Sequence, residues 1–112
     1  MSIKANIENL LVQLKYPVND TTKSQVENIA KETNEFFIIA NNIFNLKDDL
    51  APVNGLVALS NSVNRVKIKS LSSNPLEIEK FEEIVNKWSN KYKVNLEKVQ
   101  GKNTYYIVGK NS

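Results

Sequence analysis

Apolar residues in the first part of the chain recur three and four positions apart, a spacing that places them on one face of a helix. The first series consists of Ile3, Ile7, Leu10, Leu11 and Leu14. Pro17, followed by Asn19 and Asp20, then breaks the pattern. The pattern predicts a helix from about residue 3 to residue 15.

A second series follows Thr22 and predicts one longer, continuous helix. Thr22 is a good N-cap, because Gln25 three residues later would complete a capping box. The positions that then follow the helical rule are Val26, Ile29, Ala30, Thr33, Phe36, Phe37, Ala40, Ile43 and Phe44. Ile38 and Ile39 make the second half of this helix apolar beyond one face. That half is expected either to be the central helix of the core or to pair with another subunit.

Residues 48 to 72 combine helical and strand-like signals. Pro52 suits the first turn of a helix, whose apolar face would continue through Leu56, Leu59 and Val63. The segment from Arg65 to Lys69 instead alternates basic and apolar residues, as a half-buried strand does. We expect a helix from residue 52 to about residue 62, and then a strand to about residue 71.

The segment from residue 74 to residue 110 carries the clearest local signals. Asn74 is predicted to cap a helix, with Pro75 at its first position and Glu77 as the capping-box partner. The apolar stripe of this helix comprises Ile78, Phe81, Val85, Trp88 and Tyr92. We expect Trp88 in the core. A turn at 100–103 then separates two segments rich in β-formers and predicts a hairpin.

Together these elements predict an α+β fold. A helical N-terminal part of two to three helices would pack with a C-terminal unit of a strand, a helix and a β-hairpin. The strand and the hairpin would form a small antiparallel sheet. With 112 residues, the chain is long enough for one hydrophobic core but not for two. We therefore expect a single domain that spans residues 1–112.

The chain contains neither Cys nor His. This removes thiol nucleophiles, thiolate metal sites and the commonest general base. A carboxylate-only Mg²⁺ site stays conceivable, and Asp48 and Asp49 are the only adjacent aspartates. Carboxylates on an exposed helix face, such as Glu79 and Glu83, are ordinarily solvated charges. We expect no enzyme activity, no cofactor, no metal and no small-molecule substrate.

No stretch of the sequence favours a membrane. The first residues do not form the apolar core of a signal peptide, and the longest strongly apolar run, Phe36 to Ala40, has only five residues. We expect a soluble, cytoplasmic protein without a membrane partner.

The positive charge lies in the second half of the chain. Residues 1–50 carry five lysines and seven acidic residues, a net charge of −2, whereas residues 51–112 carry ten basic and five acidic residues, a net charge of +5. The candidate contacts to a nucleic-acid backbone are Arg65, Lys67, Lys69, Lys98 and Lys102. The alternative is that these residues form the ordinary solvent-facing side of a strand and a hairpin. The single Arg argues against base-specific contacts to guanine.

The order of elements over about residues 64–108 resembles the end of a winged-helix domain, in which a recognition helix precedes a two-stranded wing. The resemblance implies DNA binding by the helix and the hairpin. However, the helix that starts at Asn74 carries Glu77, Glu79, Glu82 and Glu83 in its first half. Phosphates would repel these carboxylates, so we assign the basic contacts to the strand and the hairpin instead.

The large apolar and aromatic residues suggest a protein interface. The candidate interface residues are Phe36, Phe37, Ile38, Ile39, Tyr105 and Tyr106. Side chains alternate along a strand, so Tyr105 and Tyr106 should face opposite ways, and one of them should be less buried. Asn41 and Asn42 could fix the register of a pairing between two copies.

The leading hypothesis from the sequence is a small non-catalytic interaction or regulatory protein that binds another macromolecule, either a protein partner or a second copy in a homodimer. The alternative is a nucleic-acid-binding protein that uses its basic C-terminal half. The chain has 14 Lys, one Arg and 17 Asn, which suits a low-GC genome and would fit a phage or plasmid regulator.

Overall fold

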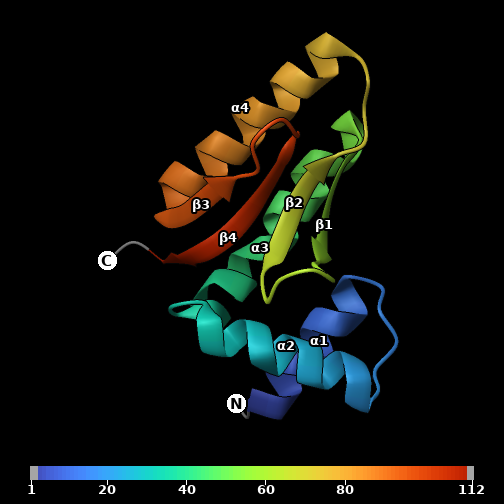
Figure 1. Ribbon diagram of the computed structural model, residues 1–112, viewed down its shortest axis with the longest axis vertical. Coiled ribbons are helices and arrows are strands. Elements are labelled where there is room, and N and C mark those ends of the chain that lie inside the picture. Colours follow the sequence, from blue (N-terminus) through green and yellow to red (C-terminus); the bar gives the residue numbers. More distant parts are fainter. Residues whose placement is uncertain (1–2, 111–112) are drawn as a thin grey trace.

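The computed structural model describes residues 3–110, which form an α+β fold (Figure 1). The helices are α1 (Ile3–Gln13), α2 (Asp20–Glu32), α3 (Phe36–Leu50) and α4 (Pro75–Tyr92), and a short 3-10 helix η1 (Ala51–Val53) follows α3. The strands are β1 (Gly55–Leu59), β2 (Val66–Ser70), β3 (Val94–Lys98) and β4 (Thr104–Lys110). The predicted fold class, with helices first and a strand, helix and hairpin at the end, is confirmed.

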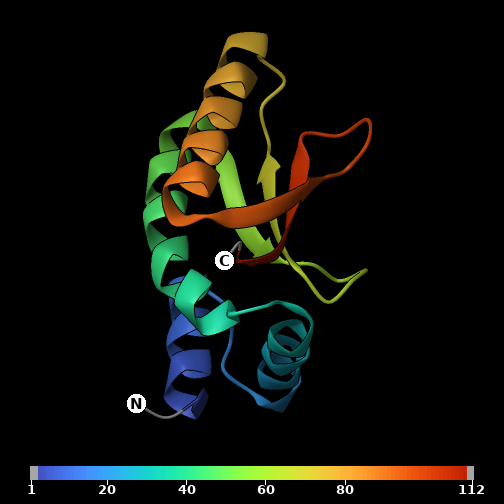
Figure 2. The same ribbon diagram turned by 90° about the vertical axis from the view of Figure 1, so that its left-hand side faces the viewer.

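The four strands form one antiparallel sheet in the order β1-β2-β4-β3. Helices α3 and α4 cover one face of this sheet, and α1 and α2 lie beyond one end of it (Figure 2). Within residues 3–110, no helix crosses the opposite face, which we call the open face. The sheet therefore has one face against the core and one face available for contacts.

The core lies between the covered face of the sheet and the helices. The sheet contributes Val57, Leu59, Val66, Ile68 and Ile107, and the helices contribute Ile39, Ile43, Leu46, Leu50, Phe81 and Val85, all of them buried. Trp88 is only 4% exposed, and its Nε1–H donates a hydrogen bond to the carbonyl oxygen of Asn42 over 2.8 Å. The prediction that Trp88 belongs to the core is confirmed.

The prediction of one long helix after Thr22 is wrong, because the helix is interrupted between α2 and α3. Thr33 is extended, and Glu35 adopts a left-handed conformation with φ 53°. Asn34 lies beside Gly109 of β4, where its carbonyl oxygen accepts a hydrogen bond from the backbone N–H of Lys110 over 3.1 Å. A Cβ atom on Gly109 would lie 3.0 Å from the Cβ atom of Asn34. The break therefore depends on a contact with a strand about 75 residues away in sequence.

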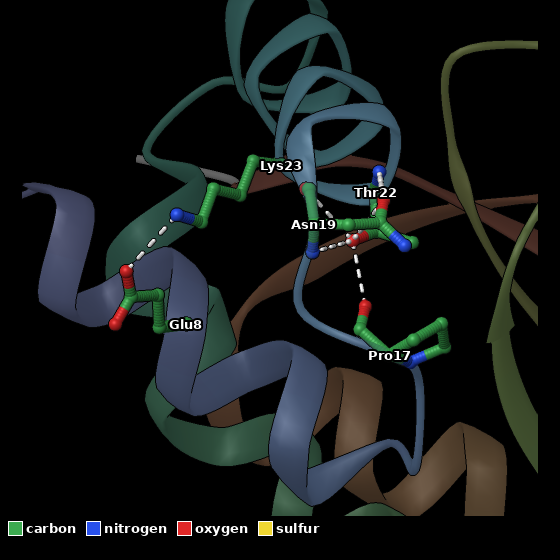
Figure 3. A network of polar contacts seen from close by, with 5 residues as sticks. All are labelled: Glu8, Pro17, Asn19, Thr22 and Lys23. Atoms are coloured by element: carbon green, nitrogen blue, oxygen red, sulfur yellow. Dashed lines mark hydrogen bonds and ion pairs between the residues drawn. The ribbon is translucent and has the colours of Figure 1, made fainter.

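The start of α2 also differs from the prediction, since Asn19 and not Thr22 is the N-cap (Figure 3). The Asn19 side chain accepts from the backbone N–H of Thr22 over 2.9 Å, and the Thr22 hydroxyl accepts from the backbone N–H of Asn19 over 3.1 Å. Thr22 is thus the inner partner of the capping box, and its hydroxyl donates to the carbonyl oxygen of Pro17. An ion pair of 3.2 Å between Lys23 and Glu8 connects α2 with α1.

The helix predicted at 52–62 is likewise wrong, because this segment forms η1 and then the edge strand β1. Asn54 ends η1 in a left-handed conformation with φ 57°. From Gly55 onward the chain pairs with β2, and the expected helical face is not formed: Leu59 is buried, whereas Val63 is 44% exposed. Pairing with β2 overrides a weak helical pattern. The strand predicted up to residue 71 is confirmed as β2.

The C-terminal elements follow the sequence closely. Asn74 caps α4, its side chain accepting from the backbone N–H of Leu76 over 3.0 Å, and the predicted hairpin is formed by β3 and β4. Glu77 is not the capping-box partner that we predicted, because its carboxylate accepts a hydrogen bond from Asn54 over 2.7 Å. Hydrogen bonds from Ser72 and then from Asn54 lower the pKa of the Glu77 carboxyl.

Candidate nucleic-acid interface

The register of β2 and β4 brings basic and hydroxyl side chains together on the open face. Lys67 lies opposite Tyr106, and Lys69 lies opposite Thr104. Ile68, between the two lysines, is fully buried against the helices, so the lysines and their partners point to the other side of the sheet. Two of the five residues predicted to contact a nucleic-acid backbone therefore share a face of the sheet with Tyr106, and Lys67 lies directly beside it.

These side chains line a shallow depression of about 220 Å³, which we call the basic depression. Its floor is formed by Lys67, Lys69, Thr104 and Tyr106. One wall is the β1–β2 loop with Ser60, Asn61 and Ser62, and the other is the β3–β4 turn with Lys102 and Val99. Figure 2 shows both loops projecting on the side of the sheet away from α3 and α4.

The basic depression has no acidic side chain in its lining. Among the side chains described for residues 6–110 the ion pairs are Lys23–Glu8 and Lys98–Glu82, so no described carboxylate is in contact with Lys67, Lys69 or Lys102. Glu97 lies opposite Tyr106 on β3, but it does not line the depression. Three unpaired ammonium groups around one concavity give a positive potential that attracts anions.

The other two predicted contacts lie elsewhere. Lys98 points toward α4, where its Nζ lies 4.0 Å from the Glu82 carboxylate. The guanidinium of Arg65 donates to the carbonyl oxygen of Glu32, and it reaches Thr33 and the carbonyl oxygen of Val108 at 3.4 Å. Arg65 therefore connects the start of β2 to the end of α2 and to β4 through its Nη1 group.

The wall formed by the β1–β2 loop is held in place by α2. Gln25 of α2 donates a hydrogen bond to the carbonyl oxygen of Ser60 over 3.1 Å, and Asn64 donates to the Glu32 carboxylate. Within the loop, the Ser60 hydroxyl lies 3.2 Å from that of Ser62. A loop fixed before binding loses less conformational entropy when a ligand is bound.

The two adjacent tyrosines face opposite sides of the sheet, as predicted. Tyr105 is 8% exposed, and its ring centroid lies 6.2 Å from that of Phe81 in the core. Burial raises the pKa of the Tyr105 hydroxyl, and the nearby Glu82 carboxylate adds to this effect. Tyr106 is only partly buried, on the open face beside Lys67. Tyr106 is thus the tyrosine available to a partner.

Of the interface residues predicted in the second helical series, Phe36 and Ile39 are buried in the core. Phe37 is partly buried, and Ile38 is 50% exposed. Phe37 and Phe44 border a cleft of about 150 Å³ between α1 and α3. Of the predicted interface residues on α3, Phe37 and Ile38 are therefore the two that a protein partner can reach.

A wider depression of about 700 Å³ lies between α3 and α4. It has acidic residues on one side, Asp48 and Asp49, and basic residues on the other, Lys87 and Lys91. Within residues 3–110, no group of three or more acidic side chains is arranged to hold a metal ion. None of the helices in that part of the chain is both long enough and apolar enough to cross a bilayer.

Reasoning from the sequence missed the contribution of the β1–β2 loop and of Thr104. The loop falls within the helix predicted at 52–62 and the start of the strand after it, so its four polar residues, Ser60, Asn61, Ser62 and Asn64, were not recognised as one surface. Thr104 does carry a usable signal, because it lies two residues before Tyr106 and must share its face in a strand.

Comparison of this chain with models of known protein families, with curated proteins and with solved structures finds no match. Its function must therefore be inferred from the geometry and the chemistry of its surface.

Proposed function

We propose that this protein is a non-catalytic nucleic-acid-binding protein and that the basic depression holds a single strand. Lys67, Lys69 and Lys102 would contact the phosphates, and a base would stack on Tyr106. The observation that supports this proposal is the convergence of three unpaired lysines and one accessible aromatic ring around a concavity without an acidic side chain. Lysine contacts and aromatic stacking are the two recurring elements of sequence-tolerant single-strand binding.

A single strand fits this surface better than a duplex. Reading a duplex in its major groove takes a protruding helix or β-ribbon, whereas here the lysines lie on a sheet between two short loops. The one guanidinium that could contact guanine, that of Arg65, is bound to α2 and β4. Sheets that display an aromatic side chain suit unpaired bases, whose faces are free to stack.

The first test is the salt dependence of binding, measured by fluorescence anisotropy with single-stranded DNA, single-stranded RNA and duplex DNA. Three phosphate contacts predict a slope of log affinity against log salt of about −2 for a single strand. A tenfold rise in salt should then weaken binding about a hundredfold. Absence of binding to either single strand at low salt would falsify the proposal, as would an affinity that does not change with salt.

A variant that replaces Lys67, Lys69 and Lys102 by Gln removes the proposed phosphate contacts. We expect affinity to fall at least about tenfold and the salt slope to become nearly flat. The matched control replaces Lys80, Lys87 and Lys91 by Gln, because these exposed lysines lie on α4, on the other side of the sheet, and the change in net charge is the same. Equal losses in both variants would mean that net charge, and not this site, drives binding.

A second candidate function is self-association through the start of α3. Its support is Ile38, which is 50% exposed beside the partly buried Phe37. Light scattering should then show a concentration-dependent dimer that Ile38→Glu converts to a monomer with an unchanged circular dichroism spectrum. A wild-type protein that stays monomeric at every concentration contradicts this candidate and leaves the nucleic-acid proposal unaffected.

A further inference from the structure

A second depression, of about 410 Å³, lies between α2 and the β1–β2 loop. We call it the amide cleft, because four side-chain amides line it: Gln25, Asn28, Asn61 and Asn64. Hydroxyl groups make up most of the remaining lining, and no charged side chain belongs to it. Its chemistry therefore contrasts with that of the basic depression, where three ammonium groups dominate.

The two depressions share a wall. Ser60, Asn61 and Ser62 line the basic depression on one side of the loop and the amide cleft on the other. A flexible chain that occupies the first and crosses the loop therefore enters the second. A single-stranded nucleic acid is such a chain, and it alternates charged phosphates with uncharged bases.

The amides of the cleft divide into two kinds. Gln25 donates to the carbonyl oxygen of Ser60, and Asn64 donates to the Glu32 carboxylate, so these two hold the cleft in shape. Asn28 and Asn61 are both exposed, and neither side-chain amide has a hydrogen-bond partner within residues 3–110. One carboxamide comes from α2 and the other from the loop, so donors and acceptors are available from both walls.

Carboxamides are suited to the edges of bases. A side-chain amide offers one acceptor oxygen and an NH₂ donor side by side, and this pair matches the amino group of adenine and its neighbouring ring nitrogen. Adenine can pair in this way with two amides at once, because its amino group lies between N1 and N7, whereas unpaired cytosine and thymine can each pair so with only one. A phosphate offers acceptors only, so it would leave the amide oxygens without a donor.

We infer that the amide cleft reads bases of the same strand whose phosphates lie on Lys67, Lys69 and Lys102, with Asn28 and Asn61 as the reading residues and adenine as the favoured base. This inference rests on the proposed function, because it needs a strand in the basic depression. It assigns backbone contact and base selectivity to opposite sides of one loop.

The test compares the affinities of the full chain for oligo-dC, for oligo-dT and for an oligo-dC that carries isolated adenines. Each affinity is measured by titration with fluorescence anisotropy as the readout. We expect the adenine-containing strand to bind at least about fivefold tighter than either homopolymer, the discrimination of one bidentate contact. The double variant Asn28→Ala with Asn61→Ala should bind the three oligonucleotides with equal affinity. The slope of log affinity against log salt should stay unchanged. The matched control, Asn86→Ala with Asn90→Ala on exposed positions of α4, should keep the preference.

Three results would overturn the inference while leaving the proposed function in place. These are equal affinities in the wild-type chain, tighter binding to either homopolymer, or an adenine preference that survives in the double variant. If none of the three oligonucleotides binds at low salt, the proposed function itself is wrong and the inference falls with it. The two failures are therefore distinguishable in one series of titrations.

Discussion

The two faces of the sheet are built from alternate residues of the same strands, but their surroundings differ. On the face toward α3 and α4 stand Val66, Ile68, Tyr105 and Ile107, all buried. On the open face stand Lys67, Lys69, Thr104 and Tyr106, which border the basic depression. The first set stabilises the fold by removing apolar surface from water. In the second set Thr104 is buried, whereas Lys67, Lys69 and Tyr106 keep exposed surface that a partner can contact.

The two faces also differ in how they tolerate substitution. The residue type at a core position is restricted by its volume and by the atoms around it. The residue type at an open-face position is restricted mainly by its charge or its aromatic ring. Changes on the covered face should lower the free energy of unfolding. Changes on the open face should lower affinity and leave that free energy nearly constant.

The largest expected effect is on the covered face. Phe81 is fully buried against the sheet beside Tyr105, so Phe81→Ala should lower the free energy of unfolding by about 3–5 kcal/mol through lost burial and a cavity. Urea denaturation followed by circular dichroism measures this change. A loss below about 1 kcal/mol would contradict the assignment of Phe81 to the core.

Arg65 sharpens the comparison, because it precedes β2 in the same alternating series as Lys67 and Lys69. Its guanidinium bonds to the end of α2 and to β4, so Arg65→Ala should cost about 1.5–3 kcal/mol of stability. Lys69→Ala is the matched control and should cost less than about 0.5 kcal/mol, since Lys69 is exposed. Equal costs in urea denaturation would mean that Arg65 is as dispensable as a surface lysine.

Tyr106→Ala should produce the opposite result from Phe81→Ala. We expect the free energy of single-strand binding to become less favourable by about 1–3 kcal/mol, because a stacked base loses the ring on which it lies. We expect the free energy of unfolding to change much less. Tyr106→Phe keeps an aromatic ring and should retain most of the affinity. If Tyr106→Phe binds as weakly as Tyr106→Ala, the hydroxyl and not stacking would be responsible.

The smallest expected effect concerns alkaline pH. Burial, with a contribution from Glu82, raises the pKa of Tyr105 in the folded state above its value in the unfolded chain. Its contribution to stability is therefore fully present below the ordinary tyrosine pKa of about 10, and it is lost as pH rises through the raised value. Tyr105→Phe should unfold less readily than the wild type at high pH, whereas Tyr106→Phe should keep the wild-type loss. Thermal unfolding at neutral and alkaline pH separates the two.

Local signals predicted the C-terminal elements well. The cap at Asn74 and Pro75, the stripe with Trp88 and the turn before Thr104 each act within a few residues, so the sequence alone was sufficient. The N-cap of α2 was a local error of three residues, whereas the two wrong helices came where distant residues meet. Asn34 beside Gly109 breaks the long helix, and pairing of β1 with β2 replaces the helix predicted at 52–62.

The same distinction holds for the candidate site. The alternation of basic and apolar residues along β2 is enough to place Lys67 and Lys69 on one face of a strand, and Lys102 follows from the hairpin turn. Arg65 belongs to the same alternation and Lys98 lies in the same hairpin as Lys102, but neither of them lines the depression. The carbonyl that Arg65 contacts and the carboxylate that Lys98 contacts depend on how α2 and α4 pack. A local sequence pattern does not encode that packing.

The sequence by itself determined the fold class, the capped helix α4, the hairpin and the side of the strand on which each residue stands, because periodicity and capping are local properties of the chain. Only the tertiary structure decided which of these residues become neighbours. In the tertiary structure, no helix within residues 3–110 crosses the open face, and a hydrogen bond connects the β1–β2 loop to α2. This arrangement forms the basic depression and the amide cleft. The physical reason is that each wall comes from a different element, and contacts between distant elements are set by how the whole core packs.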